Sequence, residues 1–111
     1  MNRLSTELYG KVVILSPHAY KGDEKARRYL CLDGFGCKGN TWEEDGHGTM
    51  IVGRFVSDGE HCSVHGGDVL RLDADQSLPP DLEAHRQEAL AAEAAWAERQ
   101  AKRAEALGRL L

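Results

Sequence analysis

The sequence predicts an α+β fold, mainly β, in which a small five-strand barrel of SH3-like or OB-like type precedes one long C-terminal helix. Two differences in composition along the chain predict this arrangement. Residues 9–75 hold nearly all the glycines, aromatic residues and β-branched residues, whereas residues 80–111 are dense in Ala, Glu and Arg. We therefore expect a β-barrel domain over residues 1–76 and a helical element over residues 77–111 that serves packing or association.

The first two strands are predicted from apolar runs that end at turn residues. Residues 11–16 (KVVILS) are apolar on both faces and stop at Pro17, which favours a strand covered on both sides. Residues 28–32 (RYLCL) form the second expected strand, which stops at Asp33-Gly34. A glycine-rich and acidic loop is expected over residues 34–48.

A hairpin is the clearest local pattern. Residues 49–57 and 60–65 flank Asp58-Gly59, a dipeptide typical of two-residue turns. A two-residue turn there would place Phe55 opposite Cys62 and Gly53 opposite Val64. One face, the expected barrel core, then holds Ile51, Gly53, Phe55, Cys62 and Val64. The other face holds Met50, Val52, Arg54, Val56, His61, Ser63 and His65, which is too apolar for simple solvent contact and predicts a covering element.

The last strand is expected at residues 69–72, after a tight turn at Gly66-Gly67-Asp68. Closing the five strands into a barrel would remove exposed sheet edges, which otherwise invite aggregation.

The tail is predicted to be a helix from about Asp81 to Leu110, with Pro80 in its first turn. At 1.5 Å per residue such a helix is about 45 Å long and should extend past its own barrel. One narrow stripe collects Leu82, Ala89, Ala92, Trp96, Leu107 and Leu111. We expect this helix to form a homodimer or a partner contact.

Composition argues against several functional classes. A formal net charge of -4 disfavours a protein whose main task is to grip phosphate backbones. Three cysteines cannot all pair within one chain, which fits reduced thiols in a cytoplasmic protein. No signal-peptide pattern and no membrane-spanning stretch is visible, so no membrane partner is expected.

The sequence contains no consistent pattern of metal ligands or of catalytic residues. The candidate ligands are Cys31, Cys37, His47, His61, Cys62 and His65, but closely spaced cysteine pairs are missing. A zinc-stabilised structural protein therefore stays an alternative, while the leading expectation includes no metal, no cofactor and no enzymatic activity. The sequence offers no fixed arrangement of a nucleophile with a base.

A second alternative is a nucleic-acid-binding barrel. Small barrels bind single strands through stacked aromatic side chains beside a basic groove. The residues that could do so here are Tyr20, Lys21, Lys25, Arg27, Arg28 and Tyr29. Asp23 and Glu24 interrupt this basic cluster.

Three segments resemble a recurring small domain of bacteriophages and mobile elements. They are residues 32–37 (LDGFGC), 53–60 (GRFVSDGE) and 68–70 (DVL), and the resemblance spans roughly residues 10–73 without the helical tail. The group has no established activity, so the resemblance implies no catalytic residue. It implies an accessory role on a host system in the host cytoplasm, for example inhibition of host defence or of CRISPR.

We therefore expect a small binding protein that occupies a surface on a host protein or complex. Exposed aromatic residues commonly anchor such contacts. The expected contact residues are Phe35, Trp42, Glu43, Glu44 and Asp45 in the loop, and Trp96 and Leu107 on the helix.

Overall fold

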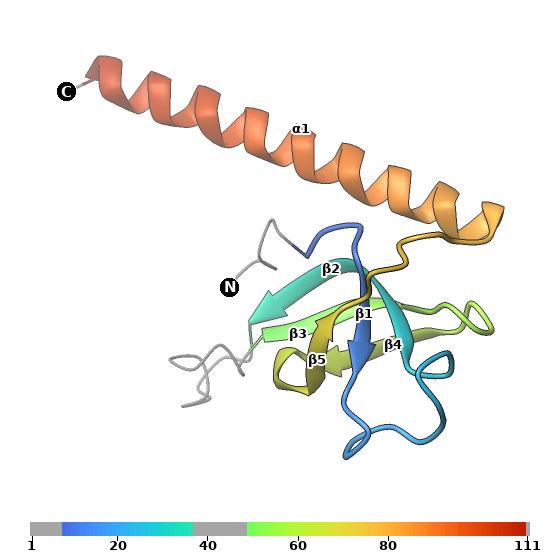
Figure 1. Cartoon of the computed structure of the whole chain (residues 1–111). Coiled ribbons are helices and arrows are strands. Elements are labelled where there is room, and N and C mark those ends of the chain that lie inside the picture. Colours follow the sequence, from blue (N-terminus) through green and yellow to red (C-terminus); the bar gives the residue numbers. More distant parts are fainter. Residues whose placement is uncertain (1–7, 37–48, 111) are drawn as a thin grey trace.

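The computed structural model describes residues 8–36 and 49–110, which form one antiparallel five-strand sheet followed by one long helix (Figure 1). The strands are β1 (Val12–Leu15), β2 (Arg28–Gly36), β3 (Thr49–Phe55), β4 (His61–His65) and β5 (Val69–Leu72). The helix α1 spans Pro80–Leu110. The α+β class and the strand-then-helix order predicted from the sequence are confirmed.

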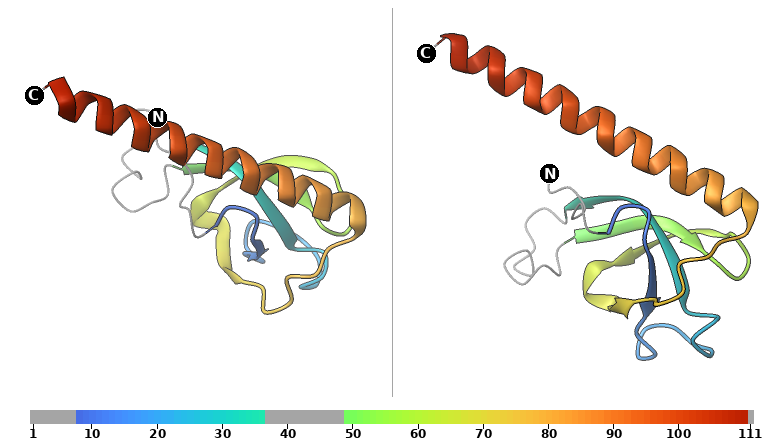
Figure 2. Two further views of the ribbon diagram at one scale, coloured as in Figure 1. Left: turned by 90° about the horizontal axis from the view of Figure 1, so that it is seen from above. Right: turned by 45° about the horizontal axis from the view of Figure 1, so that its top comes forward.

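The sheet has the order β4-β3-β2-β1-β5, so β4 and β5 are its two edges. A single 3₁₀ turn, Gly66–Asp68, joins these edges directly, and the sheet curls around its own interior (Figures 1 and 2). Among the described residues, no ladder of hydrogen bonds closes β4 onto β5.

Two apolar clusters cover the two faces of the sheet. The inner core contains Tyr9, Val13, Leu15, Tyr29, Cys31, Ile51 and Val64. The helix-side core contains Val12, Leu30, Val56 and Leu82. Val13 and Leu15 enter the inner core and Val12 enters the helix-side core, because side chains alternate across a strand. All four residues of β1 are buried, as the apolar run predicts.

The hairpin of β3 and β4 has the predicted faces but a different register. Ile51 pairs with Val64, and Gly53 pairs with Cys62, so the predicted pairing was wrong by two residues. An even shift keeps every side chain on its face, and Ile51, Gly53 and Val64 are buried as expected.

The register differs because the turn takes four residues, 56–59, instead of two. The Phe55 N–H donates to the Glu60 carbonyl oxygen at 3.0 Å, and the Gly59 N–H donates to the Phe55 carbonyl oxygen at 2.8 Å. Gly59 supplies the positive φ of 73° that this turn requires. Val56 enters the turn and is buried against the helix, which stabilises the longer turn.

β2 continues to Gly36, beyond the predicted stop at Asp33-Gly34. A bulge between Cys31 and Asp33 absorbs one residue, after which pairing with β3 resumes through Gly36 and Thr49. The expected loop over residues 34–48 is therefore strand at its beginning.

The helix begins at Pro80, one residue before the predicted start at about Asp81, and lies along the helix-side core with its first half (Figure 2). Its second half extends past the sheet, and the molecule measures 55 × 36 × 22 Å. The predicted extension of the helix past the strand domain is confirmed. In the described part of the chain, no helix is both long and apolar enough to cross a bilayer.

Candidate functional site

The segment between β5 and α1 is fixed to the sheet by the side chain of Gln76. Its Nε2 donates to the carbonyl oxygen of Val12 at 2.8 Å, and its Oε1 accepts from the Val12 N–H at 2.8 Å. The amide thus pairs with β1 as a further strand residue would. This places the chain beside β1 just before the helix begins.

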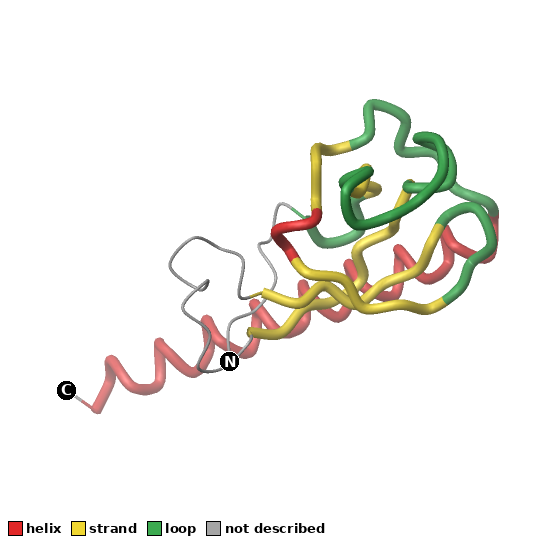
Figure 3. Tube along the Cα trace, turned by 90° about the horizontal axis from the view of Figure 1, so that it is seen from below, coloured by secondary structure: helices red, strands yellow, loops and turns green. Residues whose placement is uncertain are grey.

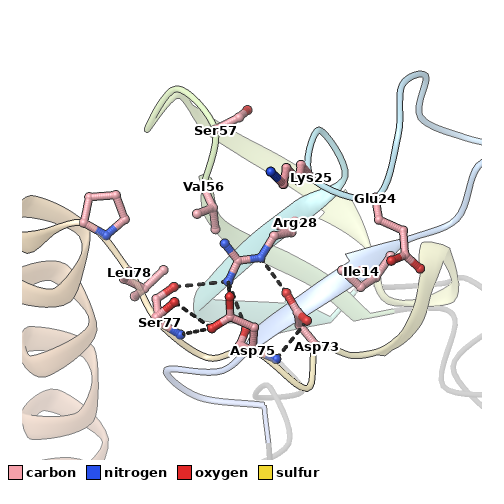
Figure 4. A pocket seen from close by; sticks show the side chains of 11 residues that line it. Ile14, Glu24, Lys25, Arg28, Val56, Ser57, Asp73, Asp75, Ser77 and Leu78 are labelled. Atoms are coloured by element: carbon pink, nitrogen blue, oxygen red, sulfur yellow. Dashed lines mark hydrogen bonds and ion pairs between the residues drawn. The ribbon is translucent and has the colours of Figure 1, made fainter.

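Arg28, the first residue of β2, also holds this segment (Figure 4). Its Nε lies 2.5 Å from Oδ2 of Asp73, and one terminal nitrogen donates to the carbonyl oxygens of Asp75 (2.9 Å) and Ser77 (3.1 Å). Charged hydrogen bonds of this kind are stronger than neutral ones. Ser77 donates from its hydroxyl and its N–H to the Asp75 carboxylate, and these bonds, with a smaller effect of Arg28, lower the pKa of Asp75.

An open groove of about 530 Å³ lies over this joint. Ile14, Val56, Leu78 and Pro79 provide its apolar lining. Among the charged side chains of its lining, Arg28 is paired with Asp73, and Glu24 is paired with Arg71. Glu24, Arg28, Asp73 and Asp75 are thus held in internal contacts, whereas Lys25 is exposed, and the groove lies at a joint between the sheet and the helix.

The first half of α1 is anchored by Leu82 and Arg86. Leu82 is 2% exposed and completes the helix-side core. Arg86 donates to the carbonyl oxygen of Gln76 at 2.6 Å. Gly10 lies beneath the helix with a φ of +72°, and a Cβ there would come within 3.0 Å of Leu90.

Trp96 lies near the end of the region where the helix faces the sheet, which extends to Arg99. It is half-buried and lines a small cavity of about 180 Å³ with Tyr9, Leu32 and Ala89. The tryptophan predicted to be an external contact thus also packs against its own domain.

Beyond Trp96, every residue of 97–109 is exposed. Leu107, the second predicted contact on the helix, is 53% exposed. Of the other stripe residues, Leu82 and Ala89 face the barrel, Ala92 is exposed, and Leu111 lies outside the described residues. Two ion pairs, Glu98 with Lys102 (3.2 Å) and Glu105 with Arg109 (2.6 Å), support this part of the helix.

The residues predicted for nucleic-acid binding do not form a surface together. Tyr29 is fully buried and donates to the carbonyl oxygen of Ile51 at 3.1 Å, so its prediction as a stacking residue was wrong. Arg27 is buried and donates to the carbonyl oxygen of Leu15 at 2.7 Å.

The remaining members of that cluster are divided between contacts and solvent. Arg28 belongs to the joint, and Tyr20 packs on Phe55 with ring centroids 5.9 Å apart. Lys21 and Lys25 are exposed. Because half of the predicted basic residues are occupied by internal contacts, only the two lysines are left on the surface.

The predicted loop contacts lie largely outside the described residues. The backbone of Phe35 belongs to β2, but its side chain and the residues Trp42, Glu43, Glu44 and Asp45 are not described. Among the predicted contact residues, those of the helix, Trp96 and Leu107, are therefore the ones whose side chains are described.

The thiols and imidazoles that are described do not gather into a set of metal ligands. Cys31 is buried, and burial raises the pKa of its thiol to about 12, which disfavours the reactive thiolate. Cys62 is half-buried, whereas His61 and His65 are exposed. Within residues 8–36 and 49–110, no three His, Cys, Asp or Glu side chains gather as metal ligands; Cys37 and His47 lie outside this part.

Sequence reasoning missed the joint that orients the helix. Asp73, Asp75 and Ser77 are residue types that form local turns, and this pattern marks the segment as a shaped connection. Nothing in the sequence indicates the long-range contacts of Gln76 with β1 or of Arg28 with Asp73.

Comparison of the chain with models of known families, with curated proteins and with solved structures finds no match.

Proposed function

We propose that this protein is a non-enzymatic binding module in which a small barrel, of SH3-like type, holds out a helical arm for contact with another protein. The single observation that carries the proposal is the contrast within α1. Leu82 is 2% exposed and fixed in a core, whereas every residue of 97–109 is exposed. Helices without tertiary contacts are marginal in water, so an arm of this length gains stability when a partner covers it.

The SH3-like assignment is supported by the strand order and by the 3₁₀ turn between β4 and β5. An antiparallel sheet ordered β4-β3-β2-β1-β5, with its edges joined at Gly66–Asp68, is a compact way to wrap five short strands around one core. The connections between β1 and β2 (residues 16–27) and between β2 and β3 (residues 37–48) are both long, whereas β3 and β4 are joined by the tight hairpin.

The contact surface we propose is the underside of the arm, where the anchored face of the helix continues past the barrel. At about 100° per residue, Arg103 and Leu107 lie on the same side of the helix as Leu82 and Trp96. Arginine and large apolar side chains are suited to anchoring an interface. The resemblance to phage-borne domains supports a host protein as the partner, with inhibition of a host-defence system as one such role.

The proposal is tested by retention of host proteins on the immobilised chain. We expect the wild-type chain to retain a protein above background, and Arg103→Ala/Leu107→Ala to lose most of it. A matched control, Gln87→Ala/Glu105→Ala, removes two side chains from the opposite side of the helix and should retain the partner. Trp42→Ala tests the contribution of the loop in the same experiment.

No protein retained above background by the wild-type chain would refute the proposal. Equal losses in the two double variants would refute the assignment of the surface.

A further inference from the structure

One lateral strip of α1 carries opposite charges at its two ends. At intervals of three and four residues it runs through Asp81, His85, Glu88, Ala92, Ala95, Arg99, Lys102, Ala106 and Arg109. All of these residues are exposed except His85, which is partly covered. The strip is therefore acidic near the barrel, small in the middle and basic on the arm.

The whole helix follows the same division. Residues 80–96 contain four carboxylates and one arginine, whereas residues 97–110 contain two carboxylates and four basic side chains. A helix divided in this way has its own charge complement in a copy of itself that runs in the opposite direction.

The spacing on the strip is symmetric about Ala95. Glu88 and Lys102 each lie 7 residues from Ala95, and Asp81 and Arg109 each lie 14 residues from it. At 1.5 Å per residue these positions are about 10 and 21 Å from the centre. A two-fold axis through Ala95 would thus place Glu88 against Lys102 of the second copy, and Asp81 against Arg109 of the second copy.

We propose that two copies of this chain associate through antiparallel α1 helices, with this strip as their interface. Each arm then lies beside the anchored half of the other helix. Ala92 and Ala95 have small side chains, which let the two helices approach closely at the axis. A parallel pairing would instead set Asp81 against Asp81 and Arg109 against Arg109, and like charges repel.

The barrel leaves room for this arrangement. Leu82 points toward the sheet, and at about 100° per residue the line through Asp81, Glu88 and Ala95 faces roughly 120° away from it. Apart from the partly covered His85, the strip is exposed along both the anchored half and the arm, and Ala92 and Arg99 at its edge also line the small cavity between the helix and the sheet. This surface also differs from the underside at Arg103 and Leu107, so self-association does not depend on the proposed function.

Charge reversal across the two halves of the strip tests the proposal by light scattering at low salt. We expect the wild-type chain to approach twice its mass of 12.2 kDa with rising concentration. Glu88→Lys alone and Lys102→Glu alone should each raise the dimer dissociation constant about tenfold or more, since each sets like charges together in both symmetric contacts. An equimolar mixture of the two variants restores opposite charges and should return to the wild-type constant.

Arg103→Glu is the matched control for Lys102→Glu. It makes the same charge change at the next residue, which faces about 100° around the helix, and should leave the dissociation constant within about threefold of the wild type. Circular dichroism of each variant verifies that the helix is intact.

A wild-type chain that stays monomeric at about 1 mM would overturn the proposal. So would a mixture of the two reversed variants that remains monomeric. Neither result would contradict the proposal that the underside of the arm binds a host protein, because that binding is measured in a separate experiment.

The position of the axis has its own readout. Ala95→Cys should form a disulfide-linked dimer on mild oxidation, because two residues on the axis come close enough to bridge. Ala101→Cys, on another side of the helix, should give no more linked dimer than the wild-type chain with its native cysteines. Equal linkage of the two variants would contradict the axis.

Discussion

Leu82→Ala tests whether the first turns of α1 are held by the helix-side core. Leu82 is 2% exposed and packs with Val12, Leu30 and Val56. Truncating a buried leucine costs about 2–5 kcal/mol, from the lost transfer free energy and the cavity left behind. Because the neighbouring turn at Gly59 can close toward the gap, we expect the lower part of this range, about 2–3 kcal/mol.

The free energy of unfolding is measured by urea unfolding, followed by circular dichroism at one fixed protein concentration. In a second measurement, thermal unfolding, the same loss of free energy in a domain of this length lowers the midpoint by roughly 10–20 °C. Leu107→Ala is the control: Leu107 is 53% exposed, and substitutions at such surface positions usually stay within about 0.5 kcal/mol. Equal destabilisation by the two substitutions would show that the arm is packed as tightly as the anchor, and would refute the division of the helix.

Three further predictions concern the inner core. Gly53→Ala should prevent stable folding, because a Cβ at this position would lie 1.9 Å from the carbonyl oxygen of Leu30. Circular dichroism should then show no folded baseline, and a stably folded variant would contradict the close approach of the two strands. Tyr29→Phe should lower the free energy of unfolding by about 1–3 kcal/mol, since buried carbonyl groups lose their donor; a change near zero in urea unfolding would mean that the hydroxyl bond is dispensable. Burial raises the pKa of the Cys31 thiol from 9.0 to about 12, so the stability that the neutral thiol provides is complete below pH 9 and is lost as the pH rises toward 12. Unfolding midpoints measured from pH 8 to 11 should fall more steeply for the wild-type chain than for Cys31→Ala, and parallel curves would rule out this cause.

The elements themselves were predictable because each depends on local pattern. The apolar run at β1, the turn at Gly66–Asp68 and the proline at the start of α1 all act within a few residues. Their boundaries in the structure agree closely with the prediction.

Register and orientation were not predictable because contacts distant in sequence decide them. Val56 is buried against Leu82, and this contact lengthens the hairpin turn beyond the two residues that Asp58-Gly59 favours. The direction of the helix depends on the hydrogen bonds of Gln76 with Val12, which lie 64 positions apart in the chain. Contacts distant in sequence also explain why Tyr29 is not on the surface, since its ring packs in the inner core.

The exposed part of α1 can change in length without disturbing the sheet, because residues 97–109 are all exposed and the helix extends beyond the strands (Figure 3). Inserting one residue near Ala97 would nevertheless rotate everything downstream by about 100°. An insertion of seven residues returns each side chain to within about 20° of its original direction. Variants with arms of different reach but the same facing surfaces should therefore differ in steps of seven residues, about 10 Å each.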